Sequence, residues 1–67
     1  ASCRVQVTAE VLSARSGADP SAQPQHELHR GDLVGAETEV QNGYRKLLDG
    51  TWALSEYLRP VPGSQCT

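Results

Sequence analysis

Two glycine turn signals stand seven residues apart in the second half of this chain, and they restrict it to short β-hairpins. The dipeptides Asn42-Gly43 and Asp49-Gly50 favour tight turns, because Asn, Asp and Gly tolerate the left-handed backbone that such turns require. Apolar residues recur at every second position near the start of the chain, and the three-to-four-residue spacing of an amphipathic helix does not occur. The sequence therefore predicts an all-β domain.

Short strands separated by close turns are expected along most of the chain. Val5 and Val7 alternate with polar residues, as in a strand with one buried face. Residues 16–25 carry two prolines and a glycine among small polar residues and are predicted to form a loop. One helical turn is expected at residues 55–58, with Ser55 as its N-cap. We predict five or six short antiparallel strands, which in 67 residues favours a small barrel or sandwich.

Two cysteines, Cys3 and Cys66, lie near the two ends of the chain. Their placement predicts one disulfide that closes nearly the whole domain, with a stabilisation of about 4 kcal/mol in the chain-entropy model. That is comparable to what a small core supplies by itself. A disulfide requires an oxidising compartment, so the pair predicts a secreted protein. The alternative is two free thiols in a cytosolic protein.

Charge and composition exclude several classes of function. Six basic residues stand against eight acidic ones, and the formal net charge of −2 argues against a nucleic-acid partner. No apolar run approaches the ~20 residues of a membrane span. His26 and His29 would lie on opposite faces of a strand with no third ligand nearby, so neither a metal nor another cofactor is expected. We also find no pairing of a nucleophile with a base that would indicate an enzyme.

Five motifs follow one another in the order and spacing of the bacterial-type SH3 domain, which the chain resembles over residues 5–58. The opening Val7-Thr8-Ala9 with Leu12–Gly17 is the first motif. The others are Arg30-Gly31-Asp32, Asn42-Gly43-Tyr44, Asp49-Gly50-Thr51-Trp52-Ala53 and Ser55-Glu56-Tyr57-Leu58. Tyr44 replaces the usual tryptophan, and the loop after Arg15 is longer than in the family. The cysteine pair is similar to that of secreted eukaryotic examples, such as those attached to fungal muramidases.

The resemblance implies an SH3-like β-barrel over residues 1–61, followed by a C-terminal linker, 62–67, that carries Cys66. It also implies a non-catalytic binding module, monomeric and secreted, that belongs to a cell-wall hydrolase such as a muramidase or lysozyme. Such modules hold the attached catalytic domain against peptidoglycan. Several bind the peptide stem or a glycine-rich cross-bridge in a groove between the first long loop and the aromatic residues.

Eight residues are candidates for ligand contact in such a groove. The three aromatic residues would supply contact area, carboxylates would accept hydrogen bonds from peptide N–H or ammonium groups, and Arg15 and Ser16 would donate to carbonyls. The candidates are Arg15, Ser16, Asp19, Glu37, Tyr44, Asp49, Trp52 and Tyr57. Three alternatives stay open: Arg15 binding loop carbonyls, Trp52 in the core, and Tyr44 in cross-strand packing. Tyr57 is expected to be exposed.

Two other functions compete with cell-wall binding. The second hypothesis is a small disulfide-closed inhibitor of a secreted protease, with the Pro-rich loop at 17–25 as its exposed reactive segment. An adaptor that binds Pro-rich ligands on an aromatic groove is the third possibility. Binding to peptidoglycan, to a protease or to a Pro-rich peptide distinguishes the three.

Overall fold

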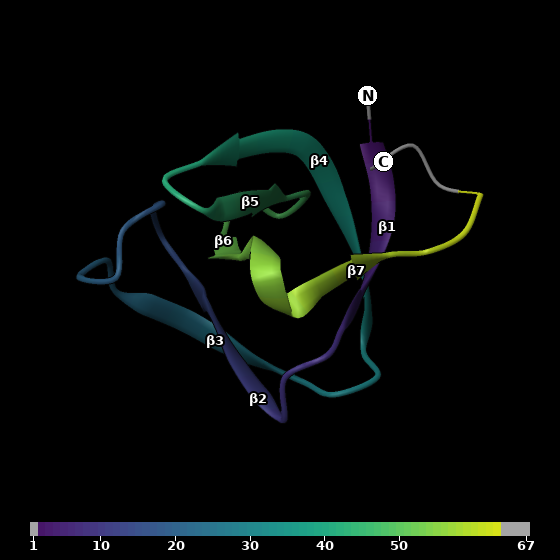
Figure 1. Ribbon diagram of the computed structural model, residues 1–67. Coiled ribbons are helices and arrows are strands. Elements are labelled where there is room, and N and C mark those ends of the chain that lie inside the picture. Colours follow the sequence, from purple (N-terminus) through teal and green to yellow (C-terminus); the bar gives the residue numbers. More distant parts are fainter. Residues whose placement is uncertain (1, 64–67) are drawn as a thin grey trace.

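The fold is an all-β arrangement in a computed structural model that describes residues 2–63. Within these residues there are seven antiparallel strands and one turn of 3₁₀-helix, η1 (Figure 1). The strands are β1 (Ser2–Val7), β2 (Val11–Arg15), β3 (Pro24–His29), β4 (Leu33–Gln41), β5 (Tyr44–Leu47), β6 (Trp52–Leu54) and β7 (Leu58–Pro60), and η1 is Ser55–Tyr57. The all-β class and the loop between β2 and β3 are as predicted, but seven strands form where five or six were predicted, and β3 begins at Pro24, inside the range predicted as loop.

The strands form a single sheet in the order β3-β2-β6-β5-β4-β1-β7, and the sheet is open. The prediction of a closed barrel was therefore wrong, because the two end strands β3 and β7 do not pair with each other within residues 2–63. The sheet folds over at β4, which pairs with β1 through Ser2↔Glu37 to Gln6↔Leu33 and with β5 further along. A register shift between Ala36 and Val40 interrupts the second ladder, and such irregularities bend a strand.

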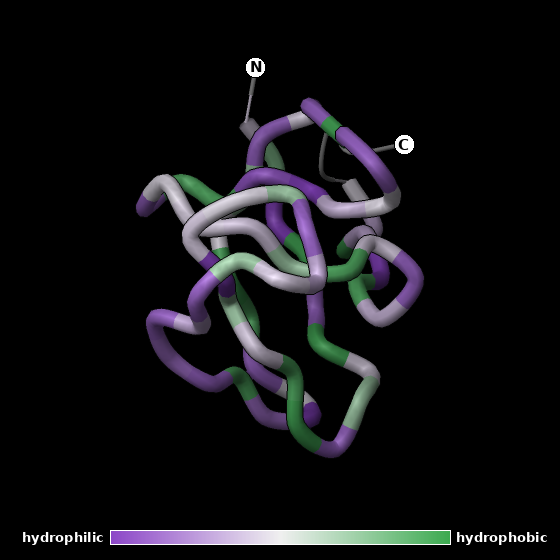
Figure 2. The backbone as a smooth tube through the Cα atoms, turned by 90° about the vertical axis from the view of Figure 1, so that its left-hand side faces the viewer, coloured by the Kyte–Doolittle hydropathy of each residue, from purple (hydrophilic) through white to green (hydrophobic). Residues whose placement is uncertain are grey.

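The core is thin and built largely from small residues. Val5 and Val7 are its largest fully buried side chains, and Ala14, Ala36 and Ala53 are completely buried. Alanines on facing strands let the two parts of the folded sheet approach closely without leaving voids. Figure 2 shows hydrophobic and hydrophilic residues alternating along the chain rather than gathering in long segments. The alternation expected at Val5 and Val7 is confirmed.

Both glycine turns form as predicted. Asn42 and Gly43 have φ angles of 52° and 82°, the left-handed pair that joins β4 to β5. Gly50, with φ of 89°, ends the turn between β5 and β6, where its N–H donates to the Leu47 carbonyl over 3.0 Å. These two turns hold β4, β5 and β6 as consecutive neighbours.

The predicted helical turn is present as η1, but its predicted cap is not. Leu54 is the N-cap residue and makes no side-chain capping bond. Ser55 instead donates twice to the Gly43 carbonyl, from its N–H over 2.9 Å and from its hydroxyl over 3.0 Å. Ser55 therefore fixes η1 against the β4–β5 turn.

The predicted pairing of Cys3 with Cys66 involves a residue outside the described range, as does most of the predicted linker 62–67. Cys3 is buried in the core, and its Sγ lies 3.5 Å from the Ala36 carbonyl oxygen. The disulfide stays a prediction. A search of the same residues found no helix long and apolar enough to cross a membrane.

Candidate functional site

Four side chains form a row across the outer face of the sheet, which we call the Trp52 row: Glu37, Lys46, Trp52 and Arg15. Trp52 on β6 stands directly opposite Lys46 on β5 and Arg15 on β2, and residues directly opposite each other project from the same face of a sheet. Glu37 on β4 extends the row, since its Oε2 lies 4.0 Å from the Lys46 Nζ. All four are half-buried, so each keeps part of its surface open to solvent.

Trp52 lies at the centre of this row and not in the core. The neighbouring residue Ala53 points the opposite way and is fully buried, whereas Trp52 is partly exposed. The Lys46 Nζ stands 5.9 Å from the centre of the indole ring, within the range of a cation–π interaction. Of the two expectations for Trp52, core and groove, its position favours surface contact.

Arg15 has the structural role that was one of its two expected roles. Its Nη1 donates to the Ala22 carbonyl over 3.0 Å, across the base of the β2–β3 loop. Ser16, also at that base, donates its N–H to the Gln23 carbonyl over 2.9 Å. Arg15 is half-buried and pairs with Trp52 across the β2–β6 ladder, so the residue that braces the loop also belongs to the row.

The β2–β3 loop is folded back on itself by its own side chains. Asp19 accepts hydrogen bonds from the N–H and the hydroxyl of Ser21, over 2.8 and 2.7 Å. These bonds, the N–H bond first, hold the pKa of the Asp19 carboxyl below its ordinary value. The Asn42 side chain donates to the Ala18 carbonyl over 3.1 Å and ties the loop to the β4–β5 turn. Asp19 is thus occupied within the loop.

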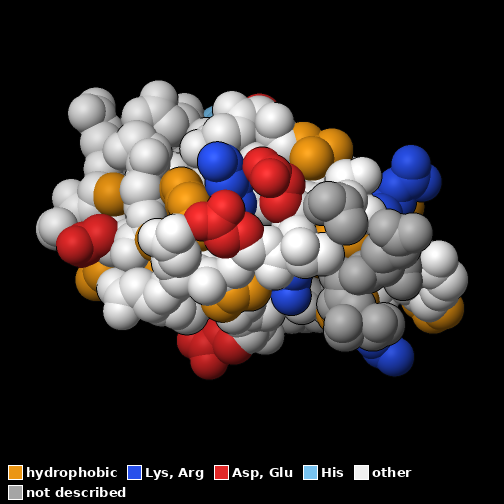
Figure 3. Space-filling view, turned by 90° about the horizontal axis from the view of Figure 1, so that it is seen from above, with side chains coloured by type: hydrophobic (Ala, Val, Ile, Leu, Met, Phe, Trp, Pro, Cys, Tyr) orange, Lys and Arg blue, Asp and Glu red, His pale blue; other side chains and the backbone are white. Residues whose placement is uncertain are grey.

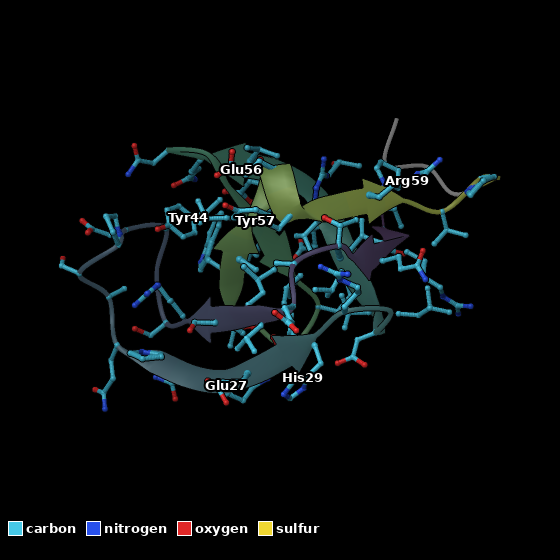
Figure 4. The ribbon with its side chains drawn as sticks, turned by 60° about the horizontal axis from the view of Figure 1, so that its bottom comes forward. Glu27, His29, Tyr44, Glu56, Tyr57 and Arg59 are labelled. Atoms are coloured by element: carbon cyan, nitrogen blue, oxygen red, sulfur yellow. The ribbon has the colours of Figure 1, made fainter. Side chains whose placement is uncertain are left out.

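The two tyrosines lie on the same side of the molecule but differ in exposure. Figure 4 draws Tyr44 and Tyr57 near the β4–β5 turn and η1. Tyr57 on η1 is 40% exposed, in agreement with the exposure expected for it. Tyr44 is only 5% exposed and pairs with Leu54, which favours its alternative role in cross-strand packing.

Asp49 lies apart from the other candidates, in the turn at the far end of β5 from Tyr44. Its Oδ1 accepts the hydroxyl and the N–H of Thr51, and its Oδ2 lies 3.0 Å from the Nε2 of His26 on β3. The Thr51 hydroxyl, then the Thr51 N–H, hold the pKa of the Asp49 carboxyl below its ordinary value, and the contact with His26 acts in the same direction. Asp49 therefore joins β3 to the β5–β6 turn.

Sequence reasoning did not identify Lys46 or His26. The signal for Lys46 is partial: the Asp49-Gly50 turn predicts a hairpin between β5 and β6, and the observed register, in which Lys46 and Trp52 each lie three residues from Asp49, brings the two opposite each other. The contact of His26 with Asp49 joins residues 23 positions apart, and no local pattern predicts it. Seen from above, the surface combines acidic and basic side chains and does not gather one sign (Figure 3).

Comparisons with protein-family models, with curated proteins and with solved structures found no match to this chain. A search of residues 2–63 for three or more His, Cys, Asp or Glu side chains able to hold a metal ion found no such group. The Trp52 row combines a partly exposed indole with two cations and one carboxylate, and Tyr57 supplies an exposed ring on η1. Such a surface is suited to a peptide with polar or charged backbone ends.

Proposed function

We propose that the open sheet is a bacterial-type SH3 fold and that the chain is a non-catalytic module for binding bacterial cell-wall peptide. The agreement between motif positions and structural landmarks supports the fold. Arg30–Asp32 is the turn before β4, Asn42-Gly43 joins β4 to β5, Asp49-Gly50 joins β5 to β6, and Ser55–Leu58 contains η1. The long hairpin of β2 and β3 corresponds to the first long loop of that family.

The single observation that carries the binding function is the half-exposed indole of Trp52, with the Lys46 Nζ 5.9 Å from the centre of its ring and Arg15 opposite it on β2. A peptidoglycan stem peptide is thin and carries carboxylates. Its aliphatic parts lie on the ring, while Arg15 and Lys46 on either side attract its carboxylates. Glu37 at the end of the row is the acceptor for a free ammonium group of the ligand. Tyr57 adds a second exposed ring.

The module would serve an attached lytic enzyme, such as a secreted muramidase. Binding to an insoluble polymer raises the effective concentration of a tethered catalytic domain at its substrate, even when each single contact is weak. The braced β2–β3 loop supports such binding, because a loop already held by Arg15 and Asn42 loses little conformational entropy when a ligand arrives. The same loop is turned back by the Ala22 N–H to Asp19 carbonyl bond of 3.0 Å, which is not the extended shape of an inhibitor's reactive segment.

Co-sedimentation with insoluble peptidoglycan tests the proposal, together with NMR titration using oligoglycine and stem peptides. We expect co-sedimentation and shifts of the amides of Lys46 and Trp52. Trp52→Ala and Tyr57→Ala should each weaken binding about tenfold, in the range found for well-placed aromatic contacts. Val11→Ala is the matched control, since Val11 is exposed on β2 four residues from Arg15.

Absence of co-sedimentation together with absence of peptide shifts contradicts the proposal. Inhibition of a panel of secreted proteases by the intact chain would support the inhibitor alternative instead. Unfolding of Tyr57→Ala, seen as loss of dispersion in the NMR spectrum, would mean that the Tyr57 ring stabilises the fold. The effect of Trp52→Ala on peptide binding would then show whether the ligand binds at the Trp52 row.

A further inference from the structure

Strand β3 has one hydrogen-bonded edge and one open edge within residues 2–63. It is the end strand of the sheet and pairs only with β2. The Arg30 N–H donates to the Glu10 carbonyl over 3.3 Å, and hydrogen-bonded pairs alternate along an antiparallel ladder. Leu28 and His26 therefore direct their backbone groups toward β2, and Glu27 between them directs its N–H and carbonyl outward.

The open part of this edge is short and has defined limits. At one end the His29 N–H donates to the Asp32 Oδ2 over 2.9 Å, and the His29 carbonyl accepts the Asp32 N–H over 3.0 Å. At the other end Pro24 has no N–H to offer. Glu27 is thus the centre of a stretch that fits a few residues of an added strand. In Figure 4, Glu27 and His29 lie along β3, in the opposite part of the view from Tyr44 and Tyr57.

A cavity of about 260 Å³ lies beside this edge. Its walls come from β3, β4, the end of β5 and the β5–β6 turn, and its β3 members His26 and Leu28 lie on one face of the strand. Its lining is mostly aliphatic, from Leu28, Val34, Leu47 and Leu48, with the His26–Asp49 contact at its rim. Leu48 is 59% exposed although its side chain lies over Gly35, where an added Cβ would come within 2.5 Å of it.

Charge decides which kind of strand fits the edge. Glu27 is exposed and is the centre of the open stretch. A second copy added antiparallel about this centre would place Glu27 directly opposite its own equivalent, and like charges opposite each other are destabilising. A cationic residue in that position is favoured for the same reason. The two flanking residues of an added strand would lie on the face of His26 and Leu28, toward the cavity.

We propose that the open edge of β3 binds an extended segment of a partner protein, with a Lys or Arg opposite Glu27 and small aliphatic residues on both sides entering the cavity. The segment adds as a strand and exchanges two backbone hydrogen bonds with Glu27. The site is separate from the Trp52 row and does not depend on cell-wall binding, so the chain would engage a protein partner and a cell-wall peptide at different surfaces.

An NMR titration of the intact chain with the capped peptide acetyl-Thr-Val-Lys-Val-Thr-amide tests the proposal. We expect shifts of the Gln25, Glu27 and Leu48 amides at millimolar peptide and none at Trp52. The matched peptide with Glu in place of Lys should bind roughly tenfold more weakly, because an attractive cross-strand pair becomes repulsive. Glu27→Lys should reverse this preference between the two peptides.

Glu27→Pro separates the backbone contribution from the charge. Proline removes only the outward N–H, so the ladder to β2 remains, and binding of both peptides should be lost. Glu27→Gln, which keeps the N–H, should retain part of the binding. If Glu27→Pro does not fold, N-methylation of the central peptide lysine removes the matching donor from the ligand, and the same loss is expected.

Three results would overturn the proposal. One is equal binding of the Lys and Glu peptides to the unchanged chain. Another is retention of binding by the N-methylated peptide. The third is a set of concentration-dependent shifts at Glu27 without any peptide, which would assign the edge to a second copy of the chain. Failure of this titration leaves the peptidoglycan result unaffected, because the two experiments use different ligands and different reporter amides.

Discussion

Strands β1 and β3 have six residues each and occupy opposite situations in the sheet. β1 lies between β4 and β7, and its inward residues Cys3, Val5 and Val7 are all buried. β3 pairs with β2 alone among residues 2–63, and Leu28 is its one buried residue. A strand that pairs on both edges stabilises the fold. A strand with an open edge has backbone N–H and C=O groups that are still free to bind another chain.

The exposed edge of β3 carries a feature that opposes pairing with copies of itself. A charged residue on an edge strand opposes pairing with identical strands, and β3 carries Glu27 at the centre of its open stretch. The turn at His29 and Asp32 closes one end of that stretch. The edge therefore disfavours pairing with β3 of a second copy and favours pairing with a strand that has a positive charge opposite Glu27.

The largest effect is expected at the centre of β1. Val5→Ala should lower the free energy of unfolding by about 2–3 kcal/mol, because it removes two buried methyl groups and leaves a cavity in a thin core. Urea denaturation followed by circular dichroism measures it. The neighbouring exposed residue Gln6 supplies the control Gln6→Ala, with a change below about 0.5 kcal/mol. Equal losses in the two variants would contradict the core position of β1.

A smaller loss is expected at the one buried residue of β3. Leu28→Ala should cost about 2 kcal/mol, at the low end for a leucine, because the cavity beside Leu28 already leaves part of the side chain without packing partners. The same denaturation experiment applies. If the loss exceeds that of Val5→Ala, β3 is as much a part of the core as β1, and the contrast between the two strands fails.

A pH-dependent effect is expected where β3 meets the β5–β6 turn. The pKa of Asp49 is lowered by folding, so its ionised form contributes stability above the ordinary Asp pKa, and that contribution is lost as the pH falls from the ordinary pKa through the lowered one. Asp49→Asn should therefore cost about 1 kcal/mol or less at pH 7, since the carboxylate is half exposed, and almost nothing once the pH is below the lowered pKa of the Asp49 carboxyl. Thermal melts across this pH range measure the difference.

Thr51→Val is the companion variant, because the Thr51 hydroxyl is the largest cause of the lowered pKa. It should reduce the same pH dependence. If the difference in melting temperature between Asp49→Asn and the unchanged chain is the same at pH 7 and at acid pH, ionisation of Asp49 does not stabilise the fold.

The smallest effect concerns the open edge itself. Glu27→Gln should change the free energy of unfolding by less than about 0.5 kcal/mol. In the unchanged chain the Glu27 amide should exchange with solvent faster than the amides of His26 and Leu28, which bond to β2. Hydrogen exchange followed by NMR measures this alternation, and equal protection at 26, 27 and 28 would mean that the outer edge of β3 is covered.

Much of the fold was predictable from local pattern. The alternation of Val5 and Val7 and the turns at Asn42-Gly43 and Asp49-Gly50 depend on properties of a few adjacent residues, and each formed as expected, with Asn42, Gly43 and Gly50 in the left-handed region. The role of Ser55 was not predictable in the same way. Its hydroxyl can cap a helix or bind a distant carbonyl, and only the approach of Gly43 decides between them.

The candidate site was predictable only in part, because its members meet through long-range pairing. Tyr57 has the expected exposure and Trp52 is partly exposed, which is one of the two positions left open for it, whereas Tyr44 is buried where β5 and β6 pair. Asp49 turned toward β3, since His26 lies within 3.0 Å of it. Closure of the sheet into a barrel also depends on long-range pairing, because the end strands β3 and β7 would have to meet in register. No turn dipeptide and no alternation of apolar residues specifies that pairing.

The joint between β2 and β6 consists of one residue pair, Arg15 and Trp52, and it contains the only tryptophan of the chain. Because the indole stands between the β2–β3 hairpin and the Lys46 side chain, its fluorescence responds to separation of that hairpin from the rest of the sheet. A shift in emission that precedes loss of the far-ultraviolet signal on heating would identify the hairpin as a unit that opens first. Trp52 fluorescence would therefore report whether the β2–β3 hairpin separates from the other strands.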